Sequence, residues 1–153
     1  MAADTGAEQV DNGSREVLNQ GYPSTLESVD IVESEVLKAA ADLGFDEDAQ
    51  NHIGMAVREC MVNAVVHGNR YNARKKVQLK VARTSGEIAI SIADEGEGFD
   101  PSAVPDPLAS ENLLRFSGRG VMLMQAFMDD FQVCSREPRG TEVKMLKHKT
   151  KTS

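Results

Sequence analysis

The stretch ECMVNAVVHG, residues 59–68, decides the fold, because it sets three polar side chains at helical spacing beside an apolar face. Glu59, Asn63 and His67 lie four residues apart, so on a helix they form one stripe. The apolar positions fall in a neighbouring arc that faces a core, namely Ile53, Val57, Cys60, Met61, Ala64 and Val65. The stretch therefore predicts a half-buried helix with oxygen and nitrogen ligands along one side.

A second motif, DEGEGF at residues 94–99, directly follows an alternating, strand-like pattern. Asp94 at the strand end can accept a hydrogen bond from an adenine amino group, which guanine does not offer at the same place. Gly96 and Gly98 let the backbone turn sharply and approach a flat ligand. A tight acidic turn without a ligand would have the same composition.

A third motif, SGRGV at residues 117–121, places Gly118 and Gly120 at the start of a predicted helix that continues from Val121. Free backbone amides and the helix dipole bind phosphates at such a position. Arg119, or Arg115 upstream, would add a charge-assisted contact to the terminal phosphate. The motif is not a P-loop, because no Gly-Lys-Ser/Thr follows.

Taken singly, each motif has an ordinary structural explanation, but the three together in this order predict a nucleotide site. Asn63 suits Mg²⁺, which prefers oxygen ligands and keeps several waters, so that one amide oxygen plus phosphates is enough. Glu59 would then take the proton from an attacking hydroxyl or water.

Length and composition set the broader limits. The 153 residues fit one domain, and the apolar runs are too short to cross a bilayer, so we expect a cytoplasmic protein. The net charge is 17 − 24 = −7, and residues 1–59 hold 13 of the acids but 3 of the basic residues. This acidic half argues against nucleic acid and suits a basic protein partner. Cys60 and Cys134 are expected to be buried thiols in a reducing compartment.

The hydrophobic pattern predicts an α+β domain over residues 15–147, with helices on one face of a mixed, mainly antiparallel sheet. Residues 1–14 are expected to be a disordered leader, 96–118 a functional lid, and 148–153 a basic tail. The predicted elements are an edge strand at 15–22, helices at 25–43 and 46–68, strands at 77–81 and 88–92, a helix at 121–127, and a hairpin at 131–135 and 141–146.

The motifs resemble those of the GHKL ATPases. Residues 59–68 resemble their N box, DEGEG their G1 box and SGRG their second glycine box, while Gly140-Thr141 resembles the strand that closes on the adenine. The continuation GRGVMLMQAFMDDFQV, residues 118–133, is still more similar to the bacterial anti-sigma factor serine kinases of the RsbW type. The resemblance covers about residues 25–146.

This resemblance implies a two-layer α/β sandwich with the Bergerat fold, and Mg-ATP as the ligand. It implies phosphorylation of a serine on a STAS-type anti-anti-sigma protein, sequestration of a sigma factor, and a homodimer. By position, Glu59 would be the general base, Asn63 the magnesium ligand and Asp94 the adenine reader. The remaining nucleotide contacts implied are His67, Gly96, Gly98, Arg115, Gly118, Arg119, Gly120, Val121 and Thr141, the last through its hydroxyl.

Two other functions stay open. The chain could be an anti-sigma or adaptor module that holds ATP only as a conformational ligand, although the presence of both Glu59 and Asn63 favours a kinase. The ATPase domain of a sensor histidine kinase is disfavoured, because His52, His67 and His148 are the only histidines and no dimerisation helix precedes the domain.

Overall fold

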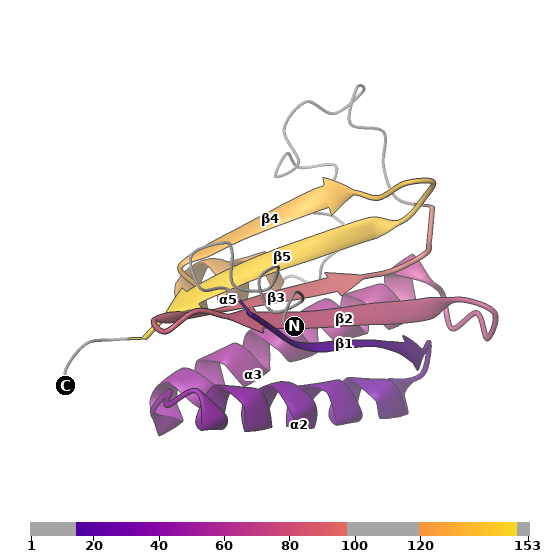
Figure 1. Ribbon diagram of the computed structural model, residues 1–153. Helices are drawn as coiled ribbons and strands as arrows, with labels where there is room; N and C mark the ends of the chain where they lie inside the picture. Colours follow the sequence, from indigo (N-terminus) through magenta and orange to yellow (C-terminus); the bar gives the residue numbers. More distant parts are fainter. Residues whose placement is uncertain (1–14, 98–119, 150–153) are drawn as a thin grey trace, which may run out of the picture.

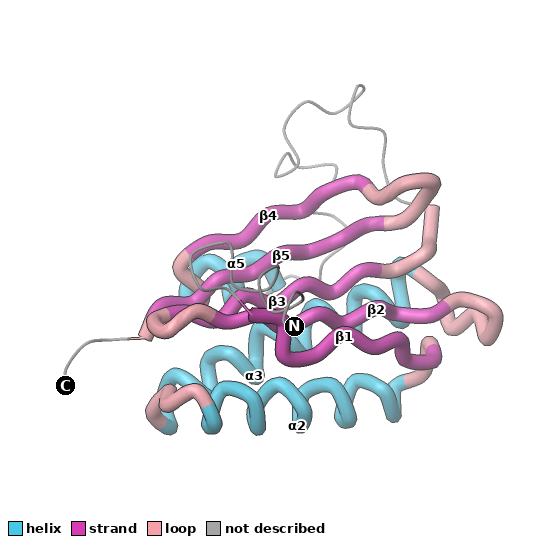
Figure 2. The backbone as a smooth tube through the Cα atoms, in the orientation of Figure 1, coloured by secondary structure: helices cyan, strands magenta, loops and turns pink. Residues whose placement is uncertain are grey.

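The structure is a computed structural model that describes residues 15–97 and 120–149. Its helices lie together on one side of a single sheet (Figures 1 and 2). In chain order the elements are β1 (Arg15–Pro23), α2 (Leu26–Asp42), α3 (Glu47–Val62), the π-helix η1 (Asn63–Gly68), β2 (Lys76–Arg83), β3 (Glu87–Ala93), α5 (Gly120–Phe127), β4 (Asp130–Ser135) and β5 (Thr141–His148).

The five strands are ordered β1-β2-β3-β5-β4, and each neighbouring pair is antiparallel. The expected α+β class is therefore confirmed, with a sheet that is antiparallel throughout its described strands rather than mixed. Strand β1 forms one edge, as predicted. The other edge is β4, which the last hairpin supplies (Figure 1).

Both long helices begin where the sequence predicts, because a side chain caps each N-terminus. The Thr25 hydroxyl accepts a hydrogen bond from the Ser28 amide, and the Asp46 carboxylate accepts one from the Ala49 amide. Arg58 on α3 then joins the two helices by donating to Asp30 and Glu33 on α2. Because Arg58 and Asp30 are largely exposed and Glu33 is partly exposed, these two ion pairs are expected to add little to stability.

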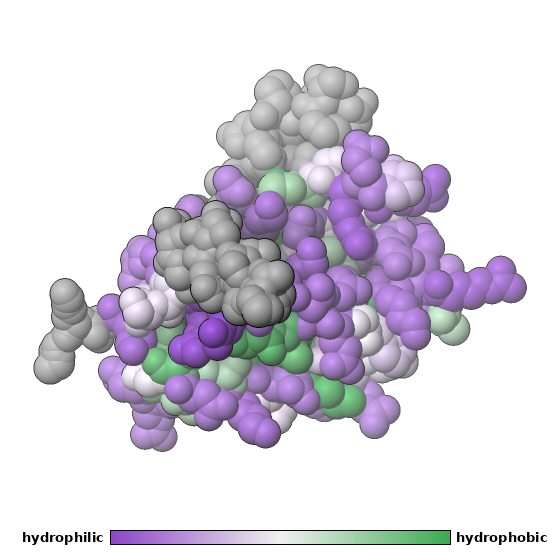
Figure 3. Space-filling view, viewed as in Figure 1, coloured by the Kyte–Doolittle hydropathy of each residue, from purple (hydrophilic) through white to green (hydrophobic). Residues whose placement is uncertain are grey.

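The core lies between the helices and one face of the sheet. Alternate residues of β2 and β3 point into it and are buried, as the period of two predicts. They are Val77, Leu79, Val81, Ile88, Ile90 and Ile92. Hydrophilic residues predominate on the face seen in Figure 3. Within the described residues, no helix is both long and apolar enough to span a membrane.

The end of β5 departs from the prediction. The strand continues to His148, beyond the predicted end at residue 146, and hydrogen bonds hold Lys147 within it and Lys149 directly after it. Lys147 Nζ donates to the Phe127 carbonyl at 2.6 Å, and Lys149 Nζ donates to the Leu43 carbonyl at 3.0 Å. Both lysines therefore cap the C-terminal ends of helices. The expected leader and most of the expected lid lie outside the described residues, and the domain limits remain predictions.

The second helix also differs from the prediction in its last turns. The α-helix ends at Val62 and continues as η1, in which the Asn69 amide donates to the Ala64 carbonyl five residues back. The chain then leaves through Arg70 and Tyr71, whose φ angles of 52° and 59° are left-handed. Short π-helical turns are frequent at functional sites. This one holds most of the first motif.

Candidate nucleotide-binding site

The three polar residues of the first motif have different surroundings. Glu59 is half-buried on the last turn of α3, Asn63 opens η1 and is 4% exposed, and His67 is exposed. Asn63 therefore lies deeper than the predicted stripe beside the core. The role of His67 in binding a nucleotide remains a prediction.

The Asn63 side chain carries the observation that most directly suggests a bound metal ion. Its Oδ1 is buried without a hydrogen-bond partner, and among the described residues no other buried side-chain nitrogen or oxygen shares this condition. Leaving such an atom unsatisfied typically costs about 1–3 kcal/mol. A lone amide oxygen at this place fits a Mg²⁺ ion that draws its other ligands from phosphates and water. The described residues contain no cluster of three or more His, Cys, Asp or Glu side chains that would hold a metal by themselves.

Asp94 lies just past the end of β3 and is 3% exposed. Its Oδ1 accepts hydrogen bonds from the Gly96 amide at 2.9 Å and from the Thr141 amide at 3.3 Å. The Asp94 amide in turn donates to the Thr141 carbonyl at 2.8 Å. The structure thus brings together Asp94 and Thr141, two residues assigned to the adenine from sequence, through one backbone–backbone bond and one bond from the Thr141 amide to the Asp94 carboxylate.

Gly96 connects the second motif to the first. A Cβ atom added to Gly96 would lie 2.2 Å from the carbonyl oxygen of Gly68, the last residue of η1. No side chain fits at that distance, so glycine is required for this contact. The end of the helix that carries Asn63 therefore lies directly against the turn that carries Asp94.

We expect Gly96→Ala to lower the free energy of unfolding by about 1–3 kcal/mol, because the added methyl group forces two backbone segments apart. Gly86→Ala is the matched control, since a Cβ there meets nothing within 4 Å. Urea denaturation of both variants checks the prediction. Equal stability of the two would contradict the close contact between Gly96 and Gly68.

Helix α5 begins at Gly120, within the third motif, and packs on α3. The Cys60 thiol donates to Met124 Sδ at 3.4 Å, and the His52 ring stacks on Phe127 with ring centroids 4.2 Å apart. Phe127, at the end of α5, therefore contacts the start of α3, whereas Met124, one turn earlier in α5, contacts α3 near its Asn63 end. The N-terminus of α5 accordingly points to the Asn63 end of α3, as a phosphate-binding helix start would require.

Cys60 is a core residue, as predicted. Burial, and to a lesser extent the neighbouring Glu59 carboxylate, raises the pKa of its thiol, so it stays protonated at neutral pH. Cys134 is half-buried rather than fully buried.

Four of the predicted nucleotide contacts lie outside the described residues, namely Gly98, Arg115, Gly118 and Arg119. Gly120 and Val121 open α5, where only their backbone is described.

Two residues that contact the site were missed from sequence. Asn69 follows η1 and is buried, and its Oδ1 accepts a hydrogen bond from the Glu95 amide at 2.8 Å. Arg136 follows β4 and donates to the Asp94 carbonyl at 2.9 Å. Asn69 lies in a turn after a helix and Arg136 in the turn between β4 and β5, and neither belongs to one of the three motifs.

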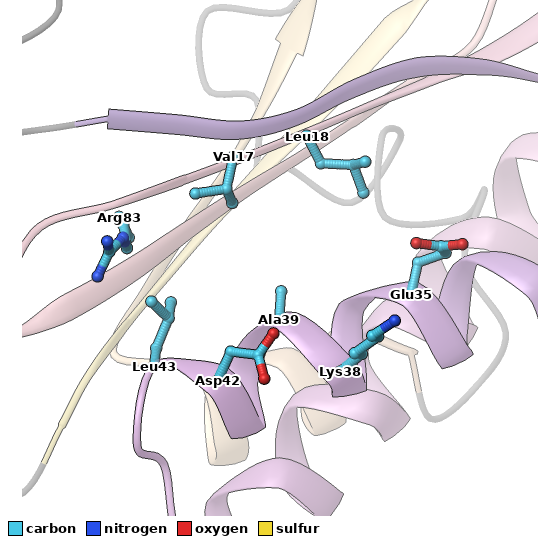
Figure 4. Close-up of a pocket in the computed structure, with 8 residues that line it drawn as sticks. All are labelled: Val17, Leu18, Glu35, Lys38, Ala39, Asp42, Leu43 and Arg83. Atoms are coloured by element: carbon cyan, nitrogen blue, oxygen red, sulfur yellow. The ribbon is translucent and has the colours of Figure 1, made fainter.

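A cavity of about 320 Å³ lies between β1 and α2, with Val17 and Leu18 facing Ala39 and Leu43 across it (Figure 4). It lies at the end of the sheet where Arg83 pairs with Ile88, opposite to the end that carries Asp94. We therefore do not assign the nucleotide to it.

Comparison with known proteins agrees with the architecture. Residues 22–147 match the family described as the histidine kinase-like ATPase domain. The anti-sigma F factor of Clostridium botulinum (strain Eklund 17B / Type B) is 34% identical over 102 residues, covering 65% of this chain and 71% of that protein. The anti-sigma F factor of Bacillus subtilis (strain 168) is 33% identical over 107 residues, covering 69% and 73%.

Among solved structures, the crystal structure of the SiaB-SiaC complex from Pseudomonas aeruginosa contains a chain that superposes with a TM-score of 0.63. The match covers 94% of both chains at 12% identity, so it supports the fold alone. The family match spans most of the chain, and the two anti-sigma F factors are similar to this chain in sequence over about two thirds of its length. This protein therefore belongs to the histidine kinase-like ATPase domain family.

Proposed function

We propose that this protein is an ATP-dependent protein-serine kinase that also acts as an anti-sigma factor. It phosphorylates a serine of a STAS-type anti-anti-sigma protein and, in its other bound state, sequesters a sigma factor. Support comes from the family, from relatives that are named anti-sigma F factors, and from the site residues that a kinase needs.

The observation that carries the proposal is the arrangement of Glu59 and Asn63. A carboxylate on the last turn of α3 precedes, by one turn, a buried amide oxygen without a hydrogen-bond partner among the described residues. A domain that only bound ATP would need the amide oxygen but not the carboxylate. The pair matches a general base beside a metal-bound phosphate group.

In the proposed reaction, the Glu59 carboxylate takes the proton of the partner's serine hydroxyl as the serine oxygen bonds to the γ-phosphorus. The bond from this phosphorus to the bridging oxygen breaks, and ADP leaves with the electron pair. Bound Mg²⁺ supplies positive charge to the phosphates. Asn63 offers it an oxygen ligand, Asp94 accepts from the adenine amino group, and the backbone at Gly118 and Gly120 contacts the phosphates.

The proposed partners also agree with the charge of the helical layer. Helix α2 exposes Glu27, Asp30 and Glu35, which suits a basic surface on a protein partner and disfavours direct contact with nucleic acid. We expect a homodimer located in the cytoplasm.

Incubation with γ-³²P-labelled ATP, Mg²⁺ and a STAS protein from the same organism tests the kinase. We expect label on one partner serine, and none after that serine is replaced by alanine. A protein that binds ATP but transfers no label to any STAS partner would instead be the non-catalytic adaptor, and the kinase proposal would be wrong. Co-purification with candidate sigma factors, with and without the STAS protein, tests the second state.

A further inference from the structure

One peptide group in the site is held on both sides by side chains from distant segments. It is the peptide that joins Asp94 to Glu95. Its N–H donates to Asn69 Oδ1 at 2.8 Å, and its carbonyl accepts from Arg136 Nη1 at 2.9 Å. The two side chains come from the end of η1 and from the β4–β5 turn, and neither belongs to the three motifs.

Asn69 is itself fixed, so its oxygen has one direction available. Its Nδ2 donates to Ser24 Oγ at 2.9 Å and to the Lys76 carbonyl at 3.0 Å. Ser24 Oγ in turn donates to the Lys75 carbonyl at 2.6 Å. With both amide protons used and the side chain 2% exposed, Oδ1 is left to face the Glu95 amide.

On the other side, the carbonyl of Asp94 is enclosed by the β4–β5 turn. The Arg136 amide donates to the Gly140 carbonyl at 3.0 Å, which holds the arginine beside this glycine. Gly140 has a φ of 117°, and a Cβ there would lie 2.1 Å from the Asp94 oxygen. The Arg136 guanidinium and Gly140, which has no side chain, therefore both lie against the Asp94 carbonyl. Arg136 also lines an open hollow of about 350 Å³ with residues 137–139.

The orientation of this peptide bears directly on the Asp94 carboxylate. Asp94 Oδ1 accepts from the Gly96 amide, one residue past the held peptide, and from the Thr141 amide. A rotation of the peptide would move the Gly96 amide and release one of these two bonds. The carboxylate would then lose the single orientation in which it can read a base.

We propose that Asn69 and Arg136 are positioning residues for adenine recognition, which act by clamping the peptide after Asp94. This inference rests on the proposed nucleotide site. It predicts that the two side chains set the preference for ATP over GTP, since a carboxylate with a variable orientation discriminates less between an amino group and a carbonyl oxygen.

The first test is Arg136→Met, which keeps most of the stem and removes the donor. Arg139→Met is the matched control, because Arg139 is exposed in the same turn and the charge change is equal. Titration with ATP and with GTP, at a temperature where each variant is folded, should show ATP binding weakened by about three- to tenfold in Arg136→Met, on the scale of one lost hydrogen bond. The ratio of GTP to ATP dissociation constants should fall by a similar factor, while Arg139→Met keeps both values.

The second test replaces the other side of the clamp. Asn69→Ala should also lower the nucleotide preference, whereas Asn72→Ala, at an exposed position of the turn that follows Asn69, should leave the preference unchanged. In the double variant of Asn69 and Arg136, the second substitution should lower the preference for ATP over GTP by less than it does alone, because the peptide is already released. If Asn69→Ala does not fold, the comparison of Arg136→Met with Arg139→Met decides whether the clamp exists.

Unchanged ATP affinity and unchanged preference in folded Arg136→Met, with a wild-type protein that binds ATP selectively, would overturn the clamp and leave the proposed function standing. A wild-type protein that binds neither nucleotide would overturn both.

Discussion

Glu59→Gln is expected to lower phosphoryl transfer by about 10²-fold or more while ATP binding stays within about twofold of wild type. The amide has the size of the carboxylate but cannot take a proton. Glu59 lies one turn before Asn63, so the substitution leaves the proposed metal ligand and the adenine end of the site in place.

Single-turnover rates with the STAS partner and equilibrium titration with ATP separate the two effects. Glu47→Gln, an exposed acid on the first turn of the same helix, is the control and should change neither value. A Glu59→Gln protein that transfers phosphate at the wild-type rate would show that Glu59 is not the base. Loss of ATP binding together with transfer would instead point to a structural role.

Asp94→Asn is expected to weaken ATP binding by roughly 10- to 100-fold, the scale of a lost hydrogen bond to a charged group. If the asparagine oxygen keeps the backbone bonds from Gly96 and Thr141, its amide group replaces the second carboxylate oxygen. A donor would then face the adenine amino group, which is itself a donor.

The control for Asp94→Asn is Glu97→Gln, which neutralises an exposed acid of the same motif. Calorimetric titration of both variants with ATP gives the comparison, and circular dichroism verifies that each is folded. Wild-type affinity in Asp94→Asn, or an equal loss in both variants, would contradict the assignment of the adenine contact to Asp94.

The features that the sequence predicted well are those that depend on local chemistry. Thr25 and Asp46 cap helices because their side chains reach amides three residues ahead. The alternation in β2 and β3 follows from the strand period and gives the buried face directly. Such features need no knowledge of what lies across the fold.

The features that were missed depend on contacts between distant segments. The change from α-helix to π-helix at Asn63 accompanies the packing of Gly68 on Gly96, which lies 28 residues further along the chain. Asn69 and Arg136 bond to backbone atoms of the Asp94–Glu95 peptide, and a backbone partner leaves no complementary residue type to find in a sequence. Asn63 was predicted as a candidate ligand from its motif, whereas its burial emerged only from the fold.

The most direct test of the central claim is a calorimetric titration of the wild-type protein with ATP and with GTP, each with and without Mg²⁺. The site described above predicts one ATP bound per chain, tighter binding when Mg²⁺ is present, and GTP binding weaker by roughly tenfold or more. Absence of ATP binding, or equal affinity for the two nucleotides that does not depend on Mg²⁺, would contradict it.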